Sequence, residues 1–243
     1  MSTRLRLGVP VAPSLPVRCV CGHPLTDCYS HLVACEVLST SAPGQHVWGF
    51  PKARNWYDVR HRLLLEQLTK DLVSAEVGVV MEPGVLDPRA DGERERDMPD
   101  QLITYQAVGR GDGVPKRVTT DLTVVEAVTR ATVENGVSVQ AKLKRAVAEK
   151  VRRHKESAEA AGCSFIPLAF ASLGTMHGEA AKFLRLDDME MDERVLQQLG
   201  SGRLLFVARL LEGLSCALAR GNARMLFAAC AELQRWVRTG AAA

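Results

Sequence analysis

The sequence lacks several features that would assign a protein to a class directly. It contains no apolar run long enough to cross a membrane, which takes about 20 residues in a helix, so we expect no membrane partner. No internal repeat is visible, and a formal charge of only +3 does not by itself indicate nucleic-acid binding. The segment 1–18 has no uninterrupted apolar stretch and is broken by Pro10, Pro13 and Pro16. This pattern predicts an extended segment and no signal peptide.

Cysteines, by contrast, are numerous and unevenly placed, because four of the seven lie between residues 19 and 35. Without a secretory signal we expect an intracellular, reducing compartment, where clustered cysteines favour a metal site over disulfides. The predicted ligands of one zinc ion are Cys19, Cys21, His31 and Cys35.

Spacing supports this zinc site. His31 and Cys35 are four residues apart, about one helical turn, so they can face one ion. A site with four protein ligands would be structural and not catalytic. The alternatives are Cys28, His23 or His46 as substitute ligands, or a set of unligated thiols.

Hydrophobic periodicity predicts an α/β core, and 243 residues with 47% hydrophobic composition can form one. The expected elements are a helix at 56–76, a strand at 77–81, two strands within 98–128, a helix at 137–161, a strand at 165–171, a helix at 179–186 and two helices at 203–219 and 223–237. Gly221-Asn222 separates the last two, which predicts a C-terminal αα-hairpin. We expect a Pro-rich lead-in and zinc segment at 1–50, an α/β core at 51–186 and a helical extension at 187–243.

The stretch 98–128 holds the most informative pair of acids. Asp100 opens one β-branched run, a turn rich in Gly and Pro follows, and Asp121 lies on a second β-branched run. Two such runs predict paired strands, which can bring both carboxylates to one edge of a sheet. Two converging carboxylates are ligands of the kind that Mg²⁺ requires, and Mg²⁺ supports phosphodiester hydrolysis. The alternative is that Asp100 caps a turn and Asp121 lies on a solvated face.

The expected helix at 137–161 concentrates positive charge. Residues 142–155 include seven Lys or Arg residues and one acid. A basic stripe of this kind can bind phosphates although the total charge is small, and the alternative is a solvated helix face. The predicted nucleic-acid contacts are Lys142, Arg152, Arg153 and Lys155. Lys150 falls on or beside the apolar face, so it can either extend to solvent or point toward the two aspartates.

Several short motifs occur in a fixed order along residues 5–180. They are Leu7-Gly8-Val9-Pro10, Cys19-Val20-Cys21-Gly22 with His31 and Cys35, Arg60-His61, Ala75-Glu76, Glu82-Pro83, Arg96-Asp97-Met98-Pro99-Asp100, Asp121-Leu122-Thr123, Lys150–His154 and Phe165-Ile166-Pro167-Leu168. Each motif is weak alone, and the ordered set is fairly specific. The set resembles the restriction-endonuclease-like domain that follows the reverse transcriptase in site-specific non-LTR retrotransposons, with its C-x-C…H…C zinc knuckle.

This resemblance implies a PD-(D/E)xK-type nuclease fold, in which helices flank a mixed sheet, and metal-dependent DNA cleavage. It implies that the chain is a fragment or a domesticated relative of a larger retroelement protein. Its partners would then be DNA, with RNA as the alternative, and a reverse transcriptase in the same parent polyprotein, and it would act in the nucleus. No polymerase motifs are present, so we do not expect this chain alone to copy nucleic acid.

The same resemblance suggests roles for individual residues. Asp100 and Asp121 would hold one Mg²⁺ or Mn²⁺, with the carbonyl of Thr123 as a third oxygen ligand. Glu82 would add a ligand or orient water; the alternative is an ordinary carboxylate at a strand end. Lys150 would stabilise the charge of the transition state.

Two departures from the nuclease pattern bear on these roles. Thr123 stands where the general motif has a lysine, so the lysine would have to come from elsewhere, from Lys150 or secondly from Lys142. The Arg-Pro-Asp motif is also interrupted by Asp97 and Met98. Both departures favour an alternative in which the fold is kept and cleavage is lost.

Three hypotheses therefore follow from the sequence. The first is a metal-dependent DNA endonuclease. The second is a non-catalytic nucleic-acid-binding module that uses the zinc knuckle and the basic helix. The third is an interaction protein whose contact surface is the C-terminal αα-hairpin.

Overall fold

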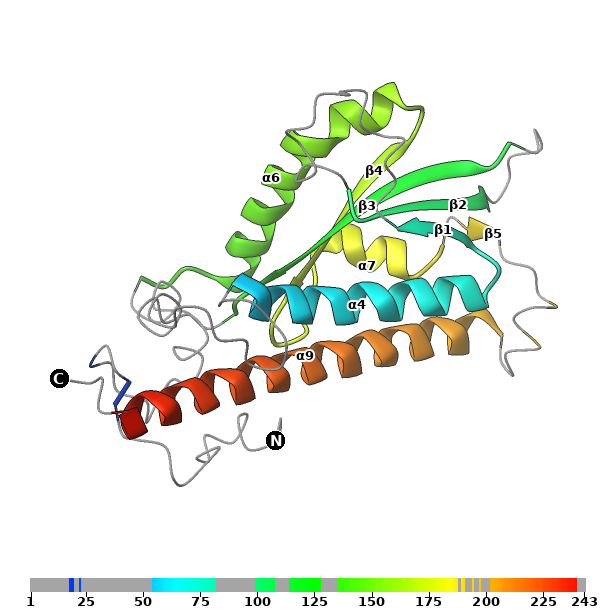
Figure 1. Cartoon of the computed structure of the whole chain (residues 1–243). Coiled ribbons are helices and arrows are strands. Elements are labelled where there is room, and N and C mark those ends of the chain that lie inside the picture. The colour runs from blue at the N-terminus through cyan, green and yellow to red at the C-terminus, as the bar shows by residue number, and fades with distance from the viewer. Residues whose placement is uncertain are drawn as a thin grey trace.

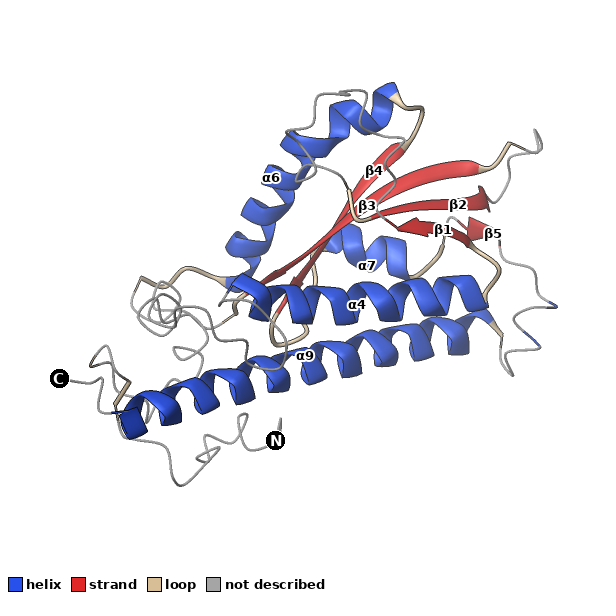
Figure 2. Cartoon of the chain, viewed as in Figure 1, coloured by secondary structure: helices blue, strands red, loops and turns tan. Residues whose placement is uncertain are grey.

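The computed structural model describes residues 18–19, 22, 54–81, 99–107, 114–127, 135–187, 189–190, 194, 197 and 202–239. Within them, a mixed five-stranded sheet packs against four helices (Figures 1 and 2), which confirms the predicted α/β class. The elements are α4 (Arg54–Ser74), β1 (Gly78–Met81), β2 (Gln101–Ala107), β3 (Lys116–Val125), α6 (Val139–Ala160), β4 (Ser164–Ala171), α7 (Gly178–Leu184), β5 (Met189–Glu190) and α9 (Arg203–Thr239). Among these helices, none is long and apolar enough to cross a membrane.

The sheet has the strand order β1-β2-β3-β4, and β5 pairs with β2. The two β-branched runs form the antiparallel pair β2–β3, as predicted. β4 lies parallel to β3 and follows it through α6, so β3, α6 and β4 form a βαβ unit. Pro167 lies in β4, which pairs only with β3 among the described strands, in agreement with the edge position that a proline predicts.

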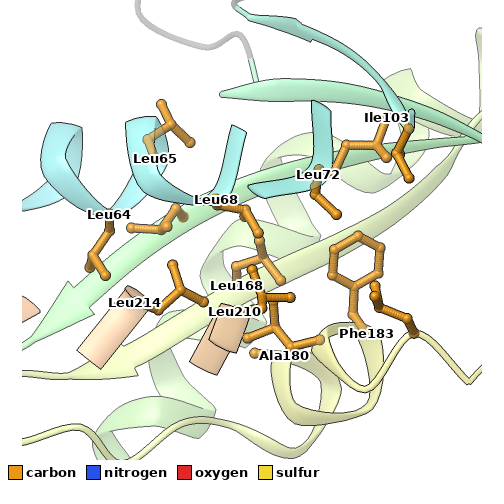
Figure 3. Packing of buried hydrophobic residues seen from close by; sticks show 14 of the residues in the cluster. Leu64, Leu65, Leu68, Leu72, Ile103, Leu168, Ala180, Phe183, Leu210 and Leu214 are labelled. Atoms are coloured by element: carbon orange, nitrogen blue, oxygen red, sulfur yellow. The ribbon is translucent and has the colours of Figure 1, made fainter. Parts of the chain in front are cut away.

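Alternating side chains divide the core between the two faces of the sheet. On one face, Ile103, Val118 and Leu168 pack against α4, α7 and α9 in the main cluster (Figure 3). In α4, Leu64, Leu68 and Leu72 are fully buried at helical spacing, and burying such a side chain contributes about 1.5–3 kcal/mol. The other face is covered by α6, where fully buried Leu143 meets Ala127, Ala169 and Ala171.

The ends of α6 follow from local sequence. The side chain of Ser138 accepts a hydrogen bond from the backbone N–H of Ala141 and caps the first turn. Gly162 ends the helix region with a φ of +68°, a conformation that favours glycine. The predicted helix at 137–161 is therefore confirmed, and it carries the basic residues along one side of the β3–β4 pair.

The predicted C-terminal αα-hairpin is wrong, because α9 continues through Gly221 and Asn222 as one helix (Figure 1). At Gly221, an added Cβ would lie 2.9 Å from the Cα of Arg60, so the glycine allows α9 to approach α4 closely. The Asn222 side chain accepts a hydrogen bond from Nη1 of Arg60 (3.1 Å) and donates one to the carbonyl of Ser172 (2.5 Å). The two residues that suggested a helix end thus serve helix packing.

Candidate active site

The start of β2 and the middle of β3 bring two carboxylates to one cavity. Gln101 pairs with Thr120, so the antiparallel register sets Asp100 opposite Asp121. Oδ2 of Asp100 accepts a hydrogen bond from the backbone N–H of Leu122 at 2.6 Å. Both aspartates line a cavity of about 310 Å³. Asp121 is buried at 3% exposure, so it does not lie on a solvated face.

Two residues of α6 contact the Asp121 carboxylate. Nζ of Lys150 lies 2.9 Å from Oδ1 and 2.8 Å from Oδ2, and Nε2 of His154 lies 2.8 Å from Oδ2. Burial raises the pKa of Asp121, but the contacts with His154 and the charge of Lys150 outweigh it, so the net pKa is lowered. Asp121 is therefore held in its ionised form. Lys150 and His154 can share one carboxylate because they are four residues apart, on the same side of α6.

His61 of α4 holds the other aspartate. Its Nε2 lies 2.9 Å from Oδ2 of Asp100 and 3.1 Å from the carbonyl oxygen of Leu122. Because both neighbours are acceptors, Nε2 carries a hydrogen and donates to them. Burial lowers the pKa of His61. This effect is outweighed by the hydrogen bond to Asp100, the charges of Asp100 and Asp121, and the hydrogen bond to the Leu122 carbonyl, so the net pKa is raised.

His154 is buried, and one of its two ring nitrogens makes no hydrogen bond with the described residues. Its ring lies 5.5 Å from the ring of Phe165, centroid to centroid. Nε2 faces Asp121, while Nδ1 is buried and has no hydrogen-bond partner in the described part of the chain. His154 belongs to α6 and lines the cavity, so its contact with Asp121 fixes the imidazole beside that carboxylate.

The remaining predicted catalytic and metal residues divide into two groups. Thr123 lines the cavity, next to Leu122 and Val124. Glu82 follows the last residue of β1 and lies outside the described residues, as do the zinc candidates Cys21, His31 and Cys35. Of the zinc site, Cys19 is described: it is buried, and its carbonyl accepts a hydrogen bond from the N–H of Gly22 at 2.8 Å.

The predicted nucleic-acid contacts on α6 point in different directions. Arg153 lines the cavity and pairs with Glu149 at 2.6 Å. Lys142 donates to the carbonyl of Glu126 at 3.2 Å and lines a second cavity. Arg152 and Lys155 are exposed and line neither cavity. The structure therefore brings only part of the basic helix toward the two aspartates.

His61 and His154 are not among the site residues predicted from the sequence. Both stand in motifs of the resemblance, and His154 follows Lys150 by one helical turn, so a shared partner could have been inferred from that spacing. His61 offers no comparable signal, because its contact with Asp100 joins residues 39 positions apart.

The oxygen ligands suit a hard cation only in part. In the described ranges, no group of three or more His, Cys, Asp or Glu side chains is arranged to hold a metal ion. Mg²⁺ is commonly held by one or two carboxylates together with substrate phosphates and water, and Asp100 and Asp121 supply the two carboxylates. Oδ1 of Asp100 makes no hydrogen bond with the described residues, so it is open to a cation, whereas both oxygens of Asp121 already contact Lys150.

Comparison with known proteins adds no assignment. No protein-family model matches the chain, and no curated protein matches it.

Proposed function

We propose that the chain is a divalent-metal-dependent DNA endonuclease of the restriction-endonuclease-like type. The observation that carries the proposal is the meeting of Asp100, Asp121 and the Lys150 ammonium at one cavity. Two carboxylates can hold a metal ion for phosphodiester hydrolysis, and a lysine can stabilise the charge that develops on the phosphate. The mixed sheet flanked by helices is compatible with this type of nuclease fold.

In this proposal Asp100 and Asp121 hold Mg²⁺ or Mn²⁺, and the carbonyl of Thr123 is a third candidate ligand. The chemistry supplied by such an ion is polarisation of the scissile phosphate and activation of water. Water adds to phosphorus and one P–O ester bond breaks, leaving a phosphate monoester and a free hydroxyl group.

The chain's own residues prepare this reaction. His61 donates to Asp100 and fixes the orientation of its carboxylate. Lys150 and His154 keep Asp121 ionised. Lys150 is 25% exposed at the cavity, so its ammonium can also reach a phosphate oxygen and stabilise the negative charge that builds up in the transition state.

One observation favours the second candidate, a nucleic-acid-binding module without cleavage. Both oxygens of Asp121 contact Lys150. Asp58 also lines the cavity, but no group of three or more ligating side chains in the described part of the chain is arranged to hold an ion. A metal ion would therefore compete with the ammonium group. The interaction-protein hypothesis has less support, because it relied on an αα-hairpin and α9 is a single helix whose Leu210 and Leu214 are buried.

Nicking of supercoiled plasmid DNA in Mg²⁺ or Mn²⁺ tests the proposal. We expect wild-type protein to nick, Asp121→Asn to abolish nicking and Lys150→Ala to reduce it by about 10²-fold or more. Asp187→Asn is the matched control, because Asp187 is exposed and lines neither cavity, and it should nick like wild type.

Thermal melts provide a second readout. A bound ion stabilises the folded state by mass action, so wild type should melt higher with metal, and the shift should shrink in Asp121→Asn. Salt-dependent DNA binding with neither nicking nor a metal-dependent shift would contradict the nuclease and select the binding module.

For the zinc knuckle we expect one structural zinc per chain, held by Cys19, Cys21, His31 and Cys35. The described turn supports this, because Cys19 is buried beside Gly22, whose φ is +84°. Cys35→Ser should lower the zinc content measured by metal analysis of purified protein. Cys216→Ser, on the exposed side of α9, is the control and should leave the content unchanged; equal content in both variants would contradict the site.

A further inference from the structure

A second cavity lies along the same helix as the candidate active site. Its volume is about 290 Å³, and it is lined by Val125, Glu126, Lys142, Arg145, Ala146 and Glu149. It is therefore formed by the end of β3 and the first half of α6. The first cavity takes its α6 residues, Lys150, Arg153 and His154, from the next turns of the helix.

The charges of this second cavity are unequal. Its two acids already have cationic partners: Glu126 pairs with Arg60 at 2.5 Å and Glu149 with Arg153 at 2.6 Å. Arg145 is exposed and makes no hydrogen bond or ion pair with the described residues. With both acids paired, Arg145 contributes a positive charge that has no partner among the described residues, which favours an anionic ligand.

The spacing along α6 links the two cavities. Lys142, Ala146 and Lys150 form one row at four-residue intervals, and Arg145, Glu149 and Arg153 form the neighbouring row. Arg145 precedes Lys150 by five residues, about 7.5 Å along the helix axis at 1.5 Å per residue. One strand of duplex DNA advances about 3.4 Å along its axis per nucleotide, so this separation corresponds to about two nucleotides.

We propose that the second cavity binds a backbone phosphate of the DNA strand about two nucleotides away from the phosphate that lies in the first cavity, and that Arg145 is its main ligand. A guanidinium group suits a phosphate because it offers paired N–H donors in one plane. This inference rests on the proposed function, since it takes the first cavity as the cleavage site. It moves the predicted phosphate footprint from Arg152 and Lys155 to the side of α6 that faces β3.

The test is DNA binding by the full chain over a series of salt concentrations, with a chelator present so that no cleavage occurs. The probe is a labelled DNA duplex. Each phosphate contact contributes about 0.9 to the slope of log K against log salt concentration. We expect Arg145→Ala to weaken binding and to reduce the slope by about 0.9. Arg152→Ala, the matched control on the exposed side of the same helix, should leave the slope unchanged.

Equal slopes for the two variants would overturn the inference, and so would a larger effect of Arg152→Ala. Binding of an RNA duplex in place of DNA would also overturn it. The proposed function fails separately: wild-type protein that binds DNA with an Arg145-dependent slope but never nicks retains the phosphate site and loses the nuclease. If wild-type protein nicks DNA and Arg145→Ala leaves the salt slope unchanged, the nuclease proposal stands and the second phosphate site is excluded.

Discussion

Two clusters of charged side chains lie near the same end of the sheet, and they differ in their access to solvent. In the first, Arg60 is 2% exposed and donates to Glu126, to Asn222 and to the carbonyl of Val124. In the second, Asp121 is buried, whereas its partner Lys150 is 25% exposed and His61 is 32% exposed at the cavity. The first cluster joins α4, β3 and α9, and its cation Arg60 borders the cavity although it is almost fully buried. The second cluster presents more exposed charges to the same cavity.

This difference indicates different roles. A buried cation with several fixed partners cannot move without leaving charges unpaired, so such a cluster holds elements in place. A cluster with exposed members can exchange partners with a ligand, because a long side chain such as Lys150 can extend into water. Partly exposed charges with shifted pKa values beside a cavity are candidates for function. The almost fully buried Arg60 is better suited to holding α4, β3 and α9 together.

The largest expected effect on stability separates the two clusters directly. Arg60→Met should lower the free energy of unfolding by about 3–5 kcal/mol, because it leaves Glu126 without its buried partner. Asp121→Asn should cost less, about 1–3 kcal/mol, because Lys150 can turn to solvent. Denaturant unfolding of both variants checks the order. If Asp121→Asn were the more destabilising change, the cluster around Asp121 would contribute more to the stability of the fold than the cluster around Arg60.

A smaller effect is expected at the glycines of α9. Gly221→Ala should cost about 1–3 kcal/mol, because its Cβ would meet the backbone of Arg60 at 2.9 Å. Gly213→Ala is the matched control: its Cβ would meet the flexible side chain of Gln67 at 2.9 Å, and alanine favours the helix by about 1 kcal/mol over glycine. Thermal melts should show a loss only for Gly221→Ala. A similar loss at both positions would contradict a specific requirement for glycine at the contact between Gly221 and Arg60.

The smallest expected effect concerns pH and His61. Its pKa is raised in the folded protein above the ordinary value of 6.5, so the folded state binds the proton more tightly than the unfolded state. The resulting stabilisation is complete below about pH 6.5 and is lost as pH rises through the folded pKa. With a chelator present, the difference in melting temperature between wild type and His61→Gln should therefore shrink as pH rises. A difference that stays constant with pH would contradict the raised pKa.

Much of the fold could be predicted from local pattern. The spacing of Leu64, Leu68 and Leu72 predicts α4, and Gly162 marks the end of α6. The β-branched runs around Asp100 and Asp121 predict the β2–β3 pair and therefore the meeting of the two acids. These features depend on residues close in sequence or on simple strand pairing.

The rest depends on contacts between distant segments. Gly221-Asn222 resembles a helix stop, and only the close approach of Arg60 explains why the helix continues. β5 has two residues, too few to show a period. The position of Lys150 on α6 is compatible with a side chain that extends into solvent or one that points toward the aspartates. Its contact with Asp121 is determined by how α6 packs on the sheet.

The long helix α9 also affects the order in which the protein can form. It follows the other described elements along the chain, yet it covers the apolar stripe of α4, and the hydrogen bond from Arg60 to Asn222 spans 162 positions. Until α9 leaves the ribosome, Leu64 and Leu68 lack the apolar residues of α9 that pack against them. The nascent chain therefore exposes hydrophobic surface, which is prone to aggregation. Because such distant contacts close large loops, we expect folding to be slow and to finish only after α9 has been synthesised.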